Sequence, residues 1–410
     1  MKGFMTLVFT LALFAVTVTL CTSSAFAAKK YLITNDDVFS SGGGANTATV
    51  YSVGAGGALT LVKTIATKGS GSGGGFFAAG RVNVLHSKTQ ACTFVTDSNP
   101  NFTVNTAPDV AAINLNTLAL VGTFHAGKMD NGANSGVGLA DAGNYLVASF
   151  SGNGTLKIGS TLGSYKILAG CKLKYLGSIA ASGINGGSPD GTKVTPDGKT
   201  VVVAYVDGSV SSYSISSTGK LALIGNELTS TGAFAAGVDI SADGKWAIFG
   251  DASGIPSVDI APISSSGVLG ATVHYQYLDQ GANSNNVLLS PDESVLFVSN
   301  NSTGGIGAVA FNKTTGVLDP THSCSSGTLK NFDASWIDLG SLAMASSNGT
   351  GSEVYAAEFG FPSGIAIVKY SPHQSGEDEF CDLTETAASP VADPASNGLV
   401  SIGVFPPRPF

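Results

Sequence analysis

Short apolar runs separated by tight turns recur along the chain beyond residue 30. The clearest copies span 191–205, 237–249 and 286–299, and each reads as a strand, an Asp-containing turn and a second strand. In such turns Pro presets φ, Asp bonds the nearby backbone and Gly accepts a positive φ. No stretch beyond residue 27 keeps an apolar spacing of 3.6 residues. The pattern therefore predicts an all-β protein.

The turn aspartates Asp197, Asp243 and Asp292 lie 46 and 49 residues apart, and weaker copies turn at Asp141 and at 348–349. This period suits a four-stranded antiparallel propeller blade. We predict a seven-bladed β-propeller that forms a single domain over 28–410. The expected blades are 30–70, 76–130, 131–184, 185–231, 232–280, 281–335 and 336–389.

The first expected blade lacks its opening strand, because residues 30–34 match the second strand of the repeat. A strand-like run at 399–405 stands at the other end of the chain. We expect residues 396–410 to supply the missing strand and close the ring. Closure of this kind removes the exposed sheet edges that promote aggregation.

The N-terminus resembles an export signal. Lys2 precedes an uncharged apolar run over 4–20, and a small-x-small site follows at 25–27. This arrangement predicts a signal peptide over 1–27 and a secreted or periplasmic protein with no transmembrane anchor after cleavage. A retained membrane anchor is the alternative. A lipoprotein is disfavoured because Leu20 stands before Cys21, where a small residue is needed.

Four cysteines remain after the expected cleavage, and an exported protein can oxidise them. They allow three pairings, and no C-x-x-C pair is present. We favour a disulfide between Cys324 and Cys381, because both lie near the outer strands of adjacent expected blades. Cys92 and Cys171 also fall in adjacent blades but at different depths. Four free thiols remain an alternative.

Composition narrows the possible partners. The formal net charge is −8, charged residues make up 12% of the chain, and Arg81 and Arg408 are the only arginines. Nucleic acid is excluded because its phosphates are met by clustered Lys and Arg. We expect a monomer whose ligand is a small molecule or a component of the cell envelope.

The blade motifs resemble a known group. The stretches 194–203 and 289–300 carry the pattern of YVTN-type repeats, and the turns at 217–221 and 312–318 fit it as well. This pattern is similar to that of seven-bladed lactonase propellers, which include 6-phosphogluconolactonase. The resemblance implies a lactone hydrolase, although its motifs build blades and do not mark a site. The scarcity of arginine counts against a phosphorylated substrate.

Candidate chemistry lies near the first strand of each blade, where propeller ligands usually bind. A lactonase needs a group that activates water and a donor for the developing oxyanion. His86 or Asp190 could be the base, and Arg81 or Lys193 could stabilise the anion. Each could instead bond loop backbone beside a wet channel. The expected ligand-binding residues are Asp130, Asn131, Lys193, Asn285 and Asn286.

No cofactor or metal is expected, although a few oxygen-rich loops could suit calcium. These loops are 35–37, Asp97 and 130–131, and none has the D-x-D-x-D-G pattern. The remaining histidines are dispersed without zinc-type spacing, so we expect them to be structural. They are His125, His274, His322 and His373.

Two functions from different classes therefore stay open. One is an exported hydrolase that opens a small sugar-type lactone at the central channel. The other is a non-catalytic exported propeller that binds a protein or polysaccharide through loops rich in Ser, Thr and Asn. A buried pocket that holds His86, Arg81 and a carboxylate together would favour the hydrolase, whereas an exposed aromatic patch on one rim would favour the binding propeller.

Overall fold

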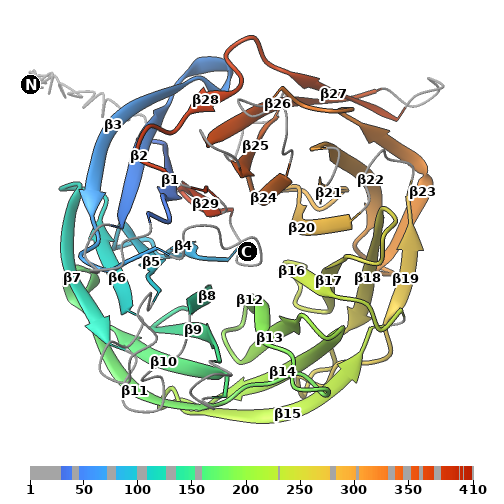
Figure 1. Cartoon of the computed structure of the whole chain (residues 1–410). Coiled ribbons are helices and arrows are strands. Elements are labelled where there is room, and N and C mark those ends of the chain that lie inside the picture. Colours follow the sequence, from blue (N-terminus) through green and yellow to red (C-terminus); the bar gives the residue numbers. More distant parts are fainter. Residues whose placement is uncertain are drawn as a thin grey trace, which may run out of the picture.

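The described strands form seven antiparallel sheets arranged around a central axis (Figure 1). This arrangement confirms the all-β class, the seven blades and the four-stranded blade. The computed structural model describes residues 29–38, 46–71, 80–98, 109–125, 135–152, 159–229, 231–277, 283–301, 304–330, 338–344, 352–359, 363–373, 380–396, 398–399 and 401–408. The expected signal peptide and the candidates Asp130 and Asn131 lie outside these residues.

Blades 1 to 4 each run from a strand at the axis to a strand at the rim. Blade 1 contains β29 (Ser401–Phe405), β1 (Tyr31–Asn35), β2 (Thr47–Val53) and β3 (Leu59–Ala66). Blade 2 contains β4 (Val82–Val84), β5 (Cys92–Thr96), β6 (Asp109–Asn114) and β7 (Ala119–His125). Blade 3 contains β8 (Ser135–Ala142), β9 (Tyr145–Ser151), β10 (Thr161–Ile167) and β11 (Leu173–Ala180). Blade 4 contains β12 (Pro189–Val194), β13 (Thr200–Tyr205), β14 (Ser209–Ile215) and β15 (Leu221–Leu228).

The remaining blades repeat this order, and the last gains a short fifth strand. Blade 5 contains β16 (Ala235–Ile240), β17 (Trp246–Asp251), β18 (Ser257–Pro262) and β19 (Val273–Gln276). Blade 6 contains β20 (Asn283–Leu289), β21 (Val295–Asn301), β22 (Ile306–Asn312) and β23 (Val317–Ser325). Blade 7 contains β24 (Asp338–Met344), β25 (Ser352–Phe359), β26 (Gly364–Pro372), β27 (Cys381–Glu385) and β28 (Val391–Ala392).

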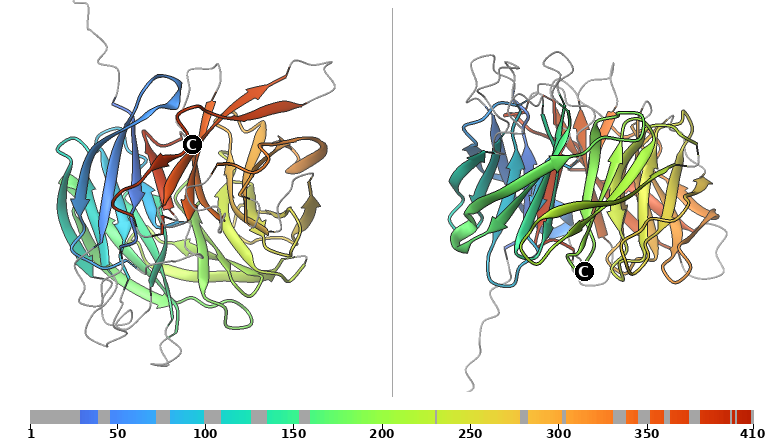
Figure 2. Two further views of the ribbon diagram at one scale, coloured as in Figure 1. Left: turned by 45° about the horizontal axis from the view of Figure 1, so that its top comes forward. Right: turned by 90° about the horizontal axis from the view of Figure 1, so that it is seen from below.

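The C-terminal strand closes the ring, as the sequence predicts. β29 pairs antiparallel with β1, from Tyr31 opposite Phe405 to Asn35 opposite Ser401. Blade 1 therefore combines the two ends of the chain, and β29 takes the axial position that the other blades fill with their own first strand. The C-terminal end lies at one flat face of the disc (Figure 2).

The Asp-containing turns share one local structure. Asp197 accepts hydrogen bonds from the Thr195 hydroxyl at 2.7 Å and from the Lys199 backbone N–H at 3.1 Å. Asp243 and Asp292 receive the same pair of bonds in their turns. The expected turn at Asp141 is wrong, because Asp141 lies inside β8 and Gly143, with φ of 60°, makes the turn. The Asp141 side chain therefore does not form a turn and can contact another part of the protein.

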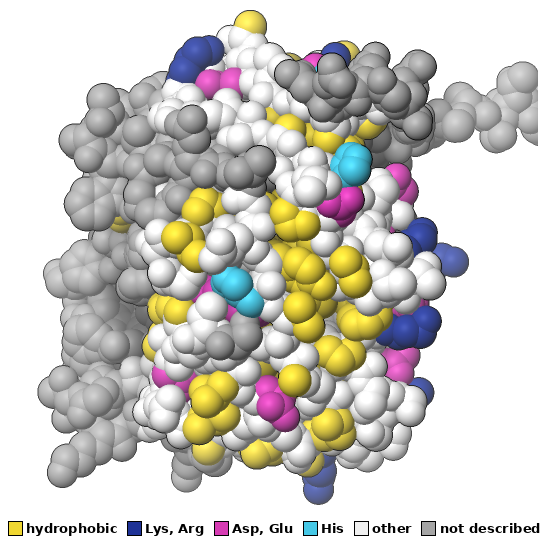
Figure 3. All heavy atoms as spheres, turned by 90° about the vertical axis from the view of Figure 1, so that its right-hand side faces the viewer, with side chains coloured by type: hydrophobic (Ala, Val, Ile, Leu, Met, Phe, Trp, Pro, Cys, Tyr) yellow, Lys and Arg dark blue, Asp and Glu magenta, His cyan; other side chains and the backbone are white. Residues whose placement is uncertain are grey.

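The core is divided among the interfaces between blades. Seven apolar clusters of described residues each join two neighbouring blades, as where Phe94 of β5 packs with Phe150 of β9. The outer strands instead face solvent on one side. Hydrophobic side chains gather on the outer edge that includes β19 and β23 (Figure 3), where Val273 is 52% and Val317 is 45% exposed.

Two disulfides join adjacent blades in the described part of the chain. Cys324 of β23 bonds Cys381 of β27, as favoured from the sequence, with a Cα–Cα distance of 5.7 Å. Cys92 also bonds Cys171, at 5.6 Å, because the 3₁₀ turn η2 (Ala169–Cys171) reaches across to β5. The different depths expected for Cys92 and Cys171 therefore do not prevent these two cysteines from forming a disulfide. Neither η1 (Ala55–Gly57) nor η2 is long enough to cross a membrane, and no other helix occurs among the described residues.

Candidate functional site

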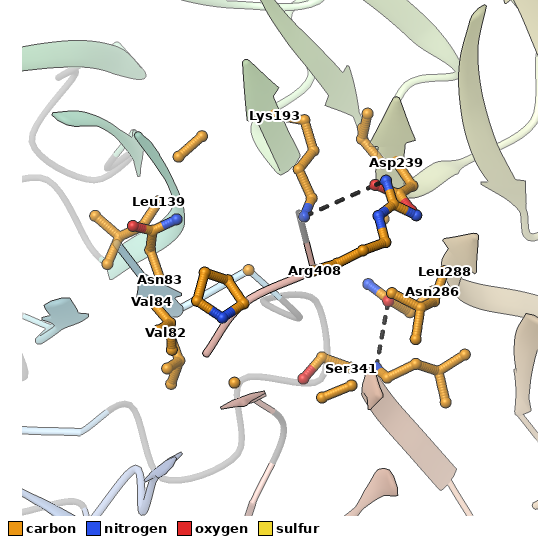
Figure 4. Close-up of a pocket in the computed structure, with 18 of the residues that line it drawn as sticks. Val82, Asn83, Val84, Leu139, Lys193, Asp239, Asn286, Leu288, Ser341 and Arg408 are labelled. Carbon is orange, nitrogen blue, oxygen red and sulfur yellow. Dashed lines mark hydrogen bonds and ion pairs between the residues drawn. The ribbon is translucent and has the colours of Figure 1, made fainter. Parts of the chain in front are cut away.

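A cavity of about 160 Å³ lies on the propeller axis. The axial strands of all seven blades line it, together with Pro407 and Arg408 from the C-terminal end. Apolar side chains such as Leu139 and Leu288 form part of its wall, and polar side chains project between them (Figure 4). An engineered apolar cavity of about 150 Å³ holds benzene, so this space suits a single small ring.

A histidine and a carboxylate meet at the wall formed by blades 2 and 3. His86 follows β4, and its Nδ1 lies 2.8 Å from Oδ1 of Asp141 on β8. Asp141 also accepts hydrogen bonds from Asn83 Nδ2 at 3.1 Å and from the His86 backbone N–H at 3.3 Å. The carboxylate is buried, whereas the His86 side chain is 23% exposed. Asp141 therefore fixes the orientation of an accessible imidazole.

Two cations meet one carboxylate on another side of the cavity (Figure 4). Arg408 Nη1 donates to Asp239 Oδ2 at 3.0 Å and to the Leu289 carbonyl at 2.8 Å. Lys193 Nζ lies 3.9 Å from Asp239 Oδ1, and its side chain is 46% exposed. The Arg408 guanidinium contacts both oxygens of the buried Asp239, whereas Lys193 makes only the longer contact. The Lys193 ammonium is therefore accessible to a ligand.

The two expected asparagines have different surroundings. Asn286 lines the cavity and accepts a hydrogen bond from the Leu342 backbone N–H at 3.4 Å. Asn285 is buried at a β-bulge and donates to the Leu339 carbonyl of blade 7 at 2.7 Å. Asn285 therefore bridges two blades and is not among the residues that line the cavity.

Arg81 and Asp190 do not lie with His86, since neither lines the axial cavity. Arg81 is buried and forms an ion pair with Asp37. Asp190 is 1% exposed and accepts a hydrogen bond from the Gly237 backbone N–H at 3.4 Å. Burial raises the pKa of Asp190 well above its usual range, opposed by this bond and by the Arg81 charge. That shift favours the neutral acid, which is a poor base.

The oxygen-rich loop at 35–37 is bonded to protein donors. Asp36 accepts hydrogen bonds from Thr34, Thr47 and Thr49. Asp97 accepts from Asn46 Nδ2 at 2.7 Å and from the Thr67 hydroxyl at 2.8 Å. A calcium ion at these oxygens would compete with these donors.

The sequence indicates His86 and Lys193, but it does not indicate Asp141, which orients His86, or Arg408, which shares Asp239 with Lys193. Asp141 reads as a turn aspartate, and Arg408 stands three residues from the end of a run that predicts only a strand. Both act across blades: Asp141 reaches blade 2 from blade 3, and Arg408 reaches blade 5. The one signal available was that Arg408 is one of two arginines in the chain.

The sequence matches no family model and no curated protein. Solved structures are similar in fold. A "putative 6-phosphogluconolactonase" from Bacteroides fragilis superposes with a TM-score of 0.66 at 14% identity, over 93% of this chain and 99% of that one. A protein from Lactobacillus plantarum gives a TM-score of 0.63 at 14% identity, over 92% of this chain and 99% of that one. The periplasmic gluconolactonase of Pseudomonas aeruginosa gives 0.60 at 16% identity, over 89% and 98%.

Sequence identities of 14–16% indicate a shared fold but not a shared activity. The superpositions cover 98% or more of each of these three chains, so the structural similarity extends over the whole ring. Together with the seven described blades, it shows that this chain has the fold of the seven-bladed β-propellers to which proteins named as lactonases belong.

Proposed function

We propose that this protein hydrolyses a small, neutral, sugar-type lactone in the axial cavity. The observation that carries the proposal is the pairing of His86 with Asp141 at 2.8 Å in a cavity that also contains Lys193. An oriented imidazole and an accessible cation are the two groups that water attack on an ester carbonyl requires. The fold shared with proteins named as lactonases adds support.

Asp141, His86 and Lys193 each have one role in the proposed hydrolysis. Asp141 engages Nδ1 of His86, so Nε2 is the nitrogen that takes a proton from water as its oxygen attacks the lactone carbonyl carbon. Lys193 stabilises the negative charge that develops on the carbonyl oxygen. The ring C–O bond then breaks, and the imidazolium returns the proton to the departing alkoxide. The product is a hydroxy acid.

The size and charge of the cavity favour a small, neutral substrate over a phosphorylated one. Its volume of about 160 Å³ suits one small ring. Lys193 and Arg408 share the charge of Asp239, and Asp141 adds a second carboxylate. These charges nearly cancel, whereas a phosphate group needs an excess of positive charge. A neutral lactone therefore fits better than a phosphorylated one.

We further propose that the protein works outside the cytoplasm. Two disulfides among the described residues are typical of an oxidising compartment. They agree with the export signal expected over 1–27. Detection of the mature N-terminus near residue 28 in a periplasmic or culture fraction tests this proposal, and a full-length chain found only in the cytoplasm would contradict it.

Turnover of a panel of neutral and phosphorylated lactones tests the enzymatic proposal. We expect His86→Gln to lower kcat/KM by about 10²–10⁴-fold, the usual contribution of a general base. His322→Gln is a matched control, because His322 pairs with Asp319 at 2.7 Å on the surface, away from the cavity. Both variants should keep the far-UV circular dichroism of the parent.

Two outcomes would overturn the proposal. Full activity in a folded His86→Gln variant would remove the imidazole from the mechanism. Absence of turnover across the panel by the folded parent would remove the hydrolase, and would direct attention to a propeller that binds a cell-envelope protein or polysaccharide.

A further inference from the structure

A second histidine–carboxylate group lies in blade 5, outside the axial cavity. Asp251 ends β17, Asp259 lies in β18 and His274 lies in β19, so the group spans three adjacent strands. Asp259 pairs with Phe249 on one side and with His274 on the other. Alternation along β17 places Asp251 on the same face as Phe249. All three side chains therefore share one face of the blade.

That face is turned toward blade 4. Phe249 belongs to the apolar cluster that joins blades 4 and 5. Thr231, from the connection between these blades, donates its hydroxyl to Asp251 Oδ2 at 3.1 Å. The group thus lies where the outer part of blade 5 meets blade 4.

The spacing of the three side chains matches a set of metal ligands. His274 Nδ1 lies 3.1 Å from Asp251 Oδ2 and 3.5 Å from Asp259 Oδ1. One ligand atom from each residue lies within 4.8 Å of the others. Zinc–ligand bonds of about 2.0–2.2 Å place neighbouring ligands about 3.0–3.5 Å apart. The group is therefore already arranged around a point that an ion could occupy.

Burial and charge favour a cation at this point. Asp251 and Asp259 are 1% and 0% exposed, and two buried carboxylates so close together require a compensating charge. Oδ1 of Asp251 accepts no hydrogen bond within the described residues. The His274 side chain is 21% exposed, which leaves the group accessible to an ion from solvent.

We propose that Asp251, Asp259 and His274 bind one divalent transition-metal ion, with Zn²⁺ as the best-suited ion. An imidazole nitrogen with two carboxylate oxygens is a ligand set that zinc accepts, and the remaining coordination positions would be filled by water. The imidazole disfavours Ca²⁺ and Mg²⁺, which prefer sets made of oxygen only.

Such an ion would join the three outer strands of blade 5 at its contact with blade 4. The disulfides join blades 2 and 3 and blades 6 and 7, and β29 joins the two ends of the chain. β19 is only four residues long and pairs with β18 alone in its sheet. Metal binding would hold this strand in place and stabilise the native state by an amount that rises with the logarithm of ion concentration above Kd.

Titration of the chelator-treated, folded protein with Zn²⁺ tests the site, with Co²⁺ as a spectroscopic substitute. We expect one equivalent to bind, to produce visible Co²⁺ absorption, and to raise Tm by a few degrees. Loss of outer-shell partners costs 10–100-fold in metal affinity, so His274→Gln or Asp259→Asn should weaken binding by at least about 100-fold.

The control is His322→Gln, which removes a histidine that faces a single, exposed carboxylate. It should leave Zn²⁺ affinity unchanged. Asp259→Asn preserves the shape of the side chain, so it guards against a variant that merely unfolds. Absence of Zn²⁺ binding by the parent would overturn the proposal and leave His274 as a structural contact between two carboxylates. Binding that survives His274→Gln would overturn it equally.

Discussion

Two histidines lie beside buried carboxylates in different regions of the propeller, and the regions differ in how the carboxylates are satisfied. In the axial cavity, His86 pairs with Asp141, which also receives hydrogen bonds from Asn83 and from the His86 backbone. In blade 5, His274 faces both Asp251 and Asp259. One imidazole is oriented by a single carboxylate that accepts two further hydrogen bonds, and the other lies between two buried carboxylates.

This difference separates two kinds of chemistry. A single carboxylate that also accepts other hydrogen bonds holds an imidazole in one orientation and supports proton transfer. Two buried carboxylates around one imidazole instead supply a set of N and O ligands that a divalent cation accepts. Similar residue types therefore support a catalytic proposal at the axis and a metal-binding proposal at the rim.

The largest expected effect comes from deletion of residues 396–410, which removes β29 and Arg408 from the axial region. Leu399, Ile402 and Val404 are at most 6% exposed. Burial of three such side chains contributes about 5–9 kcal/mol, against a total stability of about 5–15 kcal/mol. We expect loss of cooperative thermal unfolding by circular dichroism, and an unchanged Tm would contradict the role of β29.

Asp141→Asn should lower kcat/KM for the best lactone by about 10²–10³-fold, because the amide no longer orients and supports an ionised imidazole. Zn²⁺ affinity should be unchanged, since Asp141 lies outside blade 5. Asp259→Asn is the reciprocal control, with weaker Zn²⁺ binding and full turnover. If Asp141→Asn kept full activity, the distinction between the two histidines would fail.

Arg408→Ala tests the second cation of the cavity. Asp239 would lose its guanidinium partner and draw in the Lys193 ammonium, which lies 3.9 Å away. An ammonium so engaged stabilises an oxyanion less well, so we expect kcat to fall several-fold while the fold is kept. Lys245→Ala is a suitable control because Lys245 pairs with Asp243 at 2.8 Å on the surface. A kcat equal to that of the parent would mean that Lys193 acts independently of Arg408.

Glu358→Gln tests whether one buried carboxyl group makes the stability of the fold depend on pH. Glu358 is 1% exposed, and burial together with the charge of Glu385 raises its pKa from 4.5 to about 8. A carboxyl with a raised pKa binds more protons when folded, so its contribution to stability is lost as pH rises from about 4.5 to about 8.

The parent should therefore lose about 1.4 kcal/mol of unfolding free energy per pH unit through this group. Glu358→Gln should be less sensitive to pH and more stable than the parent at pH 9. Denaturant unfolding at pH 5, 7 and 9 measures the slope of unfolding free energy against pH for the parent and for the variant. Identical slopes in parent and variant would show that Glu358 is not the responsible group.

Much of the fold was predictable because it depends on local chemistry. The bonds that Asp197, Asp243 and Asp292 make lie within their own turns, so the repeat is visible in the sequence. The pairing of Cys324 with Cys381 followed from their places in the repeat. Asp141 shows where prediction from local sequence fails. It has a similar place in the repeat, but it lies inside β8 and contacts His86.

The sequence by itself determined the class of fold, the number of blades and the closing strand, because turn chemistry and strand periodicity act over a few residues. Only the tertiary structure decided which polar side chains meet. His86 with Asp141, Arg408 with Asp239, and His274 with its two aspartates are contacts between strands or blades. Such contacts depend on how blades are rotated about a common axis, and spacing along the chain does not encode that rotation.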